Sequence, residues 1–259
     1  DMAQTLVELI LVRNELADYL GYDSYEDYAN DYLYARDYTA EESQRYLEDI
    51  REKLVPLYVQ YAEESYDQRP CTELEVYRYV KDTAHAMGGT VSDAFQLLDE
   101  GELYDITQSD SKYDSSFEIF LPGYGEPYIL MNPTGTAYDQ LTFAHEFGHF
   151  CNDYAMGGAY SSVDVGEIFS QAMEYLSLVY VPADETLTRT KMADSLCTYV
   201  EQACFAEFEH RMYQIPEEEL SVEALTALYR EVTAAYGLDQ DDYFDEMRYT
   251  GITHYYDTP

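Results

Sequence analysis

The segment from Leu141 to Phe150 constrains this chain most, because it places two histidines four residues apart, with a glutamate directly after the first. In an α-helix, residues four apart lie on the same face, roughly 6 Å apart along the axis. The imidazoles of His145 and His149 can therefore reach one tetrahedral zinc ion, at about 2.0–2.1 Å each. Glu146 points away from this pair, but its side chain is long enough to reach a water molecule beside the ion.

The flanking residues predict that this segment is a single helix. Pro133 and Gly135 break the chain before it, and Thr136 can act as an N-cap, with Asp139 three positions later. Gly157 and its glycine neighbour should end the helix. We therefore expect a helix from about residue 137 to residue 154 or 155.

Gly148 lies inside this predicted helix, where glycine costs roughly 1 kcal/mol relative to alanine. A glycine kept at such a position suggests the close approach of another backbone or of a substrate. An ordinary helix-packing contact would explain it as well. In a second interpretation of the whole segment, His145 and His149 are only packed on a core helix face.

A zinc site that supports chemistry needs a third protein ligand and an open fourth position. Glu167 is our candidate, because it begins the next helical stretch after Gly166 and an antiparallel return would bring it to the histidines. Glu174, seven residues later on the same face, stays as the alternative. The chain has 52 acidic residues, and either glutamate taken alone is more often a solvated charge.

Two motifs together resemble the M3 family of zinc metallopeptidases, which includes the thimet oligopeptidases and the oligoendopeptidase F group. They are Phe143–His149, with its His-Glu-x-x-His pattern, and Gly166–Gln171, with Glu-x-x-Ser-Gln. The approach Tyr128–Asn132 and the final segment Gly251–Pro259 resemble the oligoendopeptidase F branch. The resemblance implies a mainly α fold: a multi-helix zincin-like catalytic domain with a small β-hairpin or sheet beside the His-Glu-x-x-His helix.

The resemblance also implies roles for individual residues. His145, His149 and Glu167 would hold one Zn²⁺ per chain, and Glu146 would be the general base on a zinc-bound water. The C-terminal segment would help to stabilise the transition state and to bind substrate. Its candidate catalytic residues are His254 and Tyr256, and the candidate substrate-binding residues are Tyr255 and Tyr128.

The function that follows is a zinc-dependent metalloendopeptidase acting on short, unstructured oligopeptides. Two other classes stay open. One is a catalytically inactive, zinc-dependent peptide-binding module, and the other is a helical scaffold without a metal. Glu146→Gln separates the first from the enzyme, because it should keep zinc and lose peptidase activity.

Periodicity and capping residues predict further helices over about residues 1–20, 24–35, 39–66 (broken at Pro56), 72–87, 92–98, 187–213 and 221–236. Residues 116–121 and 128–131 should form a hairpin. It either presents an edge strand to an extended peptide or only supports the metal helix. We expect a helical lobe over 1–108 and a zinc-site lobe over 109–259, in a fragment that lacks an N-terminal lobe and the extreme C-terminal end.

The net charge of −38 argues against nucleic acid and anionic membrane surfaces as partners. The four cysteines form no Cys-x-x-Cys pair, and no signal peptide or membrane span is present. Reduced thiols favour a cytoplasmic location, although the apparent truncation leaves a secreted or lipoprotein form open. Oligomeric state and cleavage-site preference are not predicted.

Overall fold

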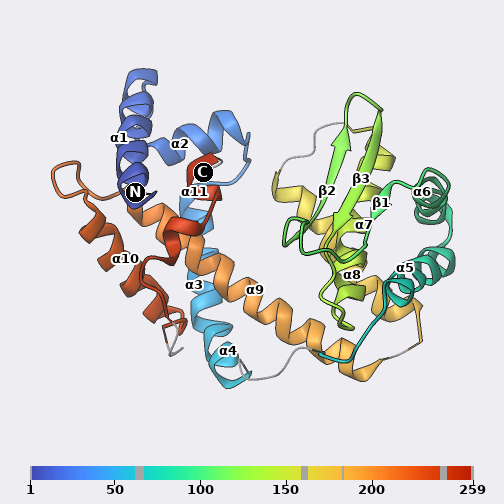
Figure 1. Ribbon diagram of the computed structural model, residues 1–259. Coiled ribbons are helices and arrows are strands. Elements are labelled where there is room, and N and C mark those ends of the chain that lie inside the picture. Colours follow the sequence, from blue (N-terminus) through green and yellow to red (C-terminus); the bar gives the residue numbers. More distant parts are fainter. Residues whose placement is uncertain (1, 62–66, 159–162, 183, 240–243, 258–259) are drawn as a thin grey trace. The chain divides into compact units, whose positions relative to one another are not determined.

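The computed structural model describes residues 2–61, 67–158, 163–182, 184–239 and 244–257. The fold is mainly helical with a small three-stranded sheet, as expected (Figure 1). The chain forms two compact units, Asp1–Glu63 with Ser195–Pro259, and Glu64–Asp194. These units differ from the predicted lobes, because residue 108 lies inside the second unit, between two strands of one sheet.

The sheet of the second unit has the order β1-β3-β2. β2 (Ser116–Leu121) and β3 (Glu126–Met131) form the predicted antiparallel hairpin, and β1 (Tyr104–Asp105) pairs parallel to β3. β1 was not predicted, because two residues carry no periodicity. Alternate residues of β3 are buried, among them Ile129 and Met131, and the hairpin contacts α7 (Figure 1).

Helices complete this unit: α5 (Glu73–Met87), α6 (Gly89–Glu100), α7 (Asp139–Met156), α8 (Val163–Tyr180) and the first residues of α9 (Glu185–Met212). α5 begins with the expected capping box of Thr72 and Glu75. The core that supports α7 is apolar and fully buried, and its members include Val80, Ala84, Phe95, Leu98, Ile129, Phe143, Phe147 and Phe150.

The start of α7 differs from the prediction. Thr136 is not the N-cap, and the capping position Tyr138 makes no side-chain cap hydrogen bond. Instead the buried carboxylate of Asp139 accepts hydrogen bonds from the backbone N–H groups of Thr134, Gly135 and Thr136. Asp139 thus folds the preceding loop against the helix terminus, and the helix begins two residues later than predicted. Its end at Gly157, in the left-handed conformation, is as expected.

The first unit contains α1 (Met2–Leu20), α2 (Tyr25–Tyr28), the π-helix η1 (Ala29–Leu33), α3 (Ala40–Lys53), α4 (Val55–Tyr61), most of α9, α10 (Val222–Ala235), η2 (Arg248–Gly251) and α11 (His254–Asp257). The helix predicted over 39–66 is split at Leu54, one residue before the turn that holds Pro56. Among the described residues, no helix combines the length and the apolar character needed to cross a lipid bilayer.

Candidate metal centre

α7 places His145 and His149 one turn apart on the same face, as their spacing predicts. Their ring centroids are 5.0 Å apart and the rings meet edge to face. Both side chains are partly exposed, whereas Glu146 is buried. Each of His145, Glu146 and His149 offers one possible ligand atom, and these three atoms lie within 4.8 Å of one another. The three residues together could therefore hold a metal ion.

Glu167, near the start of α8, faces both histidines. Its Oε2 lies 3.4 Å from Nε2 of His145, and its Oε1 lies 3.5 Å from Nε2 of His149. Ligand atoms bound at about 2.0–2.2 Å to a tetrahedral ion are roughly 3.3–3.5 Å apart. The spacing of these nitrogen and oxygen donors therefore fits zinc.

The carboxylate of Glu167 is ionised, which is the form that can bind a metal ion. Its pKa is lowered to about 2 by the hydrogen bond with His149, and a hydrogen bond from Ser170 adds to this against the opposing effect of burial. Oγ of Ser170 donates to Oε2 at 2.6 Å. The serine of the Glu-x-x-Ser-Gln motif thus orients the glutamate one turn before it.

Glu174 lies on the other side of His145. Its Oε1 is 2.9 Å from Nδ1 of the ring, and its side chain is buried. An ionised carboxylate only accepts hydrogen bonds, so Nδ1 carries a proton, and Nε2 is the ring nitrogen that faces Glu167 and can bind a metal. This geometry favours Glu167 over Glu174 as the third ligand and gives Glu174 the position of a group that orients the ring.

Gly148 accounts for the approach of α8. A Cβ atom at this position would lie 2.5 Å from the carbonyl oxygen of Phe169 and 2.6 Å from Cα of Ser170. The expected close approach of another backbone is confirmed, and it is at the same time a helix-packing contact. It brings α8 close enough for Glu167 to face the histidines.

Glu146 lies in an environment that suits a base. Burial raises its pKa, although His145 and His149 act in the opposite direction. A backbone hydrogen bond from Glu118, in β2, also reaches its carboxylate. The two carboxyl groups lie close enough for the charge of Glu146 to affect the pKa of Glu118.

Glu118 was not among the predicted site residues. Burial, with the charges of Asp153 and Glu146, raises its pKa to about 8, and its Oε1 is buried without a hydrogen-bond partner in the described part of the chain. Glu118 pairs with Ile129 in the hairpin, so its side chain shares the inner face of the sheet. The position of Glu118 on the inner face follows only from the strand register. The sequence does not reveal it, because residues 116–121 do not alternate cleanly between polar and apolar.

The remaining predicted residues lie elsewhere. Tyr128 is in β3, on the face opposite to the buried Ile129. In the first unit, His254 is exposed, and Tyr255 is buried with its hydroxyl donating to the carbonyl of Phe205. The hydroxyl of Tyr256 is 3.2 Å from the carbonyl oxygens of Met2 and Thr250. Of the three predicted residues in this segment, His254 is therefore the exposed one, whereas Tyr255 is buried and Tyr256 is partly buried.

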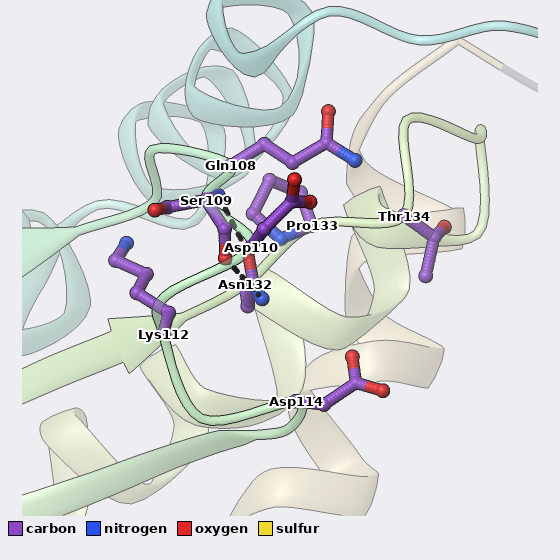
Figure 2. Close-up of a pocket in the computed structure, with 8 residues that line it drawn as sticks. All are labelled: Gln108, Ser109, Asp110, Lys112, Asp114, Asn132, Pro133 and Thr134. Atoms are coloured by element: carbon purple, nitrogen blue, oxygen red, sulfur yellow. Dashed lines mark hydrogen bonds between the residues drawn. The ribbon is translucent and has the colours of Figure 1, made fainter.

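A separate polar pocket of about 340 Å³ lies in the second unit, and Figure 2 shows the residues that line it. The loops 108–114 and 132–134 line it, and Ser109 and Asn132 hydrogen-bond across it. The ammonium of Lys112 is engaged by Asp105 and by nearby backbone carbonyls. The pocket contains none of the predicted site residues, and its contacts stabilise the loops.

A helical fold with His-Glu-x-x-His on one helix and a facing glutamate on the next defines the zincin-like class of protein. The family model described as Peptidase family M3 matches residues 90–259. The chain therefore belongs to peptidase family M3.

Individual relatives agree with this family. The chain is 30% identical over 128 residues to an oligoendopeptidase F homologue of Borreliella burgdorferi, a match that covers 43% of this chain and 22% of the relative. A solved structure of an oligoendopeptidase F has a TM-score of 0.83 at 19% identity, over 98% of this chain and 51% of the other. PZ peptidase A, solved with an inhibitor, gives the same values.

An oligoendopeptidase F from Bacillus anthracis matches with a TM-score of 0.76 at 19% identity, over 94% of this chain and 50% of the other. At this identity the structural matches show the fold. The chain spans about half the length of these solved structures, and its match to the curated relative covers 22% of that protein.

Proposed function

We propose that this chain is the catalytic region of a zinc-dependent metalloendopeptidase that cleaves short, unstructured oligopeptides. The observation that carries the proposal is the placement of the Glu167 carboxylate at 3.4 and 3.5 Å from the two Nε2 atoms of His145 and His149. Membership of family M3 supports it independently. A packed pair of histidines in a scaffold would not need an ionised carboxylate facing both rings.

The donor set of two imidazoles and one carboxylate suits a catalytic zinc, one per chain, because it leaves a fourth position open. Zinc, when bound, acts as a Lewis acid and makes water a nucleophile near neutral pH. Glu146 takes the proton of the attacking water on its carboxylate and passes it to the leaving amine nitrogen. Burial raises the pKa of Glu146, which makes this carboxylate a stronger base than an exposed one.

The peptide substrate would lie along the sheet. β2 is an edge strand, and Phe117 and Ile119 are exposed on it. An extended peptide can pair with such an edge through backbone hydrogen bonds. We assign the stabilisation of the developing oxyanion to the segment with His254 and Tyr256, as family resemblance implies, with Tyr128 as a candidate substrate contact. Tyr255, the other candidate that the resemblance implies, is buried within the first unit in this structure.

A cytoplasmic location is part of this proposal. The four cysteines are free thiols, which is the usual state in a reducing compartment. The absence of a spanning helix among the described residues is compatible with it. The strongly acidic composition makes nucleic acid an unfavourable partner.

Two measurements test the function. Zinc content after dialysis should be about one ion per chain and should be lost in His145→Ala. Hydrolysis of internally quenched short peptides should require Glu146, so that Glu146→Gln keeps zinc but loses activity by at least 100-fold, the lower range for general-base catalysis. Full activity in Glu146→Gln would remove Glu146 as the base. Zinc binding without turnover by the parent chain would instead favour the inactive peptide-binding module.

A further inference from the structure

A chain of polar contacts leads from the metal centre into the interior of the second unit. Nδ1 of His145 lies 2.9 Å from Oε1 of Glu174, and the other carboxylate oxygen, Oε2, lies 2.8 Å from Nζ of Lys191. The three residues come from α7, α8 and α9. Each carboxylate oxygen of Glu174 therefore has its own partner: His145 on α7 for Oε1 and Lys191 on α9 for Oε2.

Lys191 is fully buried, which is rare for a lysine because an ammonium group loses its hydration there. An ammonium group has three N–H donors. Besides Glu174, Nζ reaches Oε1 of Gln171 at 3.0 Å and Oδ2 of Asp194 at 3.4 Å. The three N–H donors of the ammonium group thus have three acceptors, one each on Glu174, Gln171 and Asp194. These three contacts fix the position of the ammonium group.

The acceptors of Lys191 are themselves held. The hydroxyl of Tyr138, just before α7, donates to Oδ1 of Asp194 at 2.9 Å. Gln171 is the last residue of the Glu-x-x-Ser-Gln motif, one turn before Glu174 on α8. The network therefore joins the N-terminal end of α7, the helix that carries the two histidines, to the buried side of α8.

We infer that Lys191 is a positioning residue of the metal centre, acting through Glu174 to hold the ring of His145 with Nε2 presented as a ligand. The inference rests on the proposed function, because it concerns the same site. Glu174 alone could rotate about its terminal torsion, which is soft. Lys191 removes that freedom by binding Oε2, and so directs Oε1 to Nδ1 of His145.

A salt bridge with only a packing role predicts something different. In that case removal of Lys191 lowers the stability of the fold and leaves zinc affinity unchanged. A positioning role predicts a loss of zinc affinity of 10- to 100-fold, the range typical for partners of metal-binding histidines. It also predicts that the loss depends on Glu174.

The experiment measures zinc affinity of the 259-residue chain by competition with a chromophoric chelator, without any peptide. Lys191→Met, of similar length but uncharged, should weaken zinc binding 10- to 100-fold. Glu174→Gln should weaken it to a similar degree, and the double variant should be no weaker than Glu174→Gln alone, because the two residues act in one path. Lys81→Met, at a half-exposed lysine of α5, is the matched control and should bind zinc like the parent.

The outcomes separate the two proposals. Parent-like zinc affinity in Lys191→Met, or losses that multiply in the double variant, would overturn the role of Lys191 and leave the metal centre intact. A parent chain that binds no zinc would overturn the metal centre and this inference with it. If Lys191→Met does not fold, Lys191→Gln carries the comparison with the parent, because it keeps an N–H donor but is too short to hold Oε2 of Glu174 in the same place. It should also weaken zinc binding, and parent-like zinc affinity in it would overturn the role of Lys191.

Discussion

Gly148 of α7 and Phe169 of α8 lie so close that a Cβ atom on the glycine would be 2.5 Å from the phenylalanine carbonyl oxygen. This contact determines how near α8 comes to the helix that carries the two histidines. Because Glu167 lies two residues before Phe169, the same contact sets the distance between the carboxylate and the imidazoles. The packing of α8 against α7 and the spacing of the candidate ligands therefore both depend on this one glycine.

Gly148→Ala is therefore expected to weaken zinc binding by at least tenfold. The added methyl group has to push the α8 backbone away, and overpacking of this kind costs about 1–3 kcal/mol, against a gain in helix propensity of about 1 kcal/mol. The measurements are a chelator competition and a urea titration of the metal-free chain. Gly166→Ala, inside α8 with open space around its Cβ position, is the control. It should keep zinc affinity, and parent-like affinity in Gly148→Ala would contradict the argument.

Glu167 and Glu174 should differ in what their removal damages. The Glu167 side chain is 62% exposed, so Glu167→Ala should lower zinc affinity strongly and leave the metal-free fold within about 0.5 kcal/mol of the parent. The Glu174 side chain is only 5% exposed and is paired with Lys191. Glu174→Ala should therefore destabilise the metal-free fold by about 3–5 kcal/mol, because it leaves a buried charge without its partner.

The comparison is made by calorimetric zinc titration beside thermal unfolding in the presence of a chelator. The assignment would be wrong if Glu167→Ala binds zinc like the parent while Glu174→Ala folds but no longer binds zinc. Glu174 would then be the third ligand. The orientation of His145 by Glu174 would then need another explanation.

Glu118 should make the stability of the metal-free chain fall as pH rises. Its pKa is raised to about 8 in the folded chain, from about 4.3 for an unperturbed glutamate. Between these values the folded chain binds the proton and the unfolded chain does not, so the free energy of unfolding decreases with increasing pH. Below about pH 4.3 both states are protonated and this contribution is constant.

Glu118→Gln removes this titration while keeping a similar shape. Its stability relative to the parent should increase steadily from about pH 4.5 to about pH 8 and then level off. Urea unfolding in the presence of a chelator, at several pH values, measures the difference. A difference that does not change with pH would show that Glu118 ionises normally in the folded chain.

Arg13 should be needed for order in the C-terminal helix α11. This buried side chain donates to the backbone carbonyls of Tyr255 and Tyr256, each through one guanidinium nitrogen, and to the hydroxyl of Tyr213. Arg13→Met leaves these acceptors unpaired, which should cost about 2–3 kcal/mol of stability. Amide hydrogen exchange in residues 252–257 should accelerate as well.

The control is Arg45→Met. The side chain of Arg45 is 68% exposed, so its loss should change stability by less than about 0.5 kcal/mol. Unchanged exchange around His254 in Arg13→Met would mean that other contacts hold the segment, for example the hydrogen bond from Tyr255 to the carbonyl of Phe205.

The sites that could be predicted from sequence are those that local geometry determines. His145, Glu146 and His149 follow from a four-residue spacing on one helix, and the hairpin follows from two short apolar runs around a proline- and glycine-rich turn. The N-cap of α7 was predicted wrongly at Thr136, because the buried Asp139 carboxylate takes the backbone N–H groups of the preceding loop. β1 was missed, because a strand of two residues exists only through its pairing with β3.

By itself, the sequence determined that two histidines share one helix face and that a glutamate-containing helix follows, because covalent spacing and the α-helical repeat are sufficient for this. It did not decide between Glu167 and Glu174, which are seven residues apart on the same face of α8. The tertiary structure favours Glu167, because the contact at Gly148 brings that end of α8 to the Nε2 side of the histidines while Lys191 holds Glu174 at Nδ1. Contacts between helices, which no local pattern encodes, make that difference.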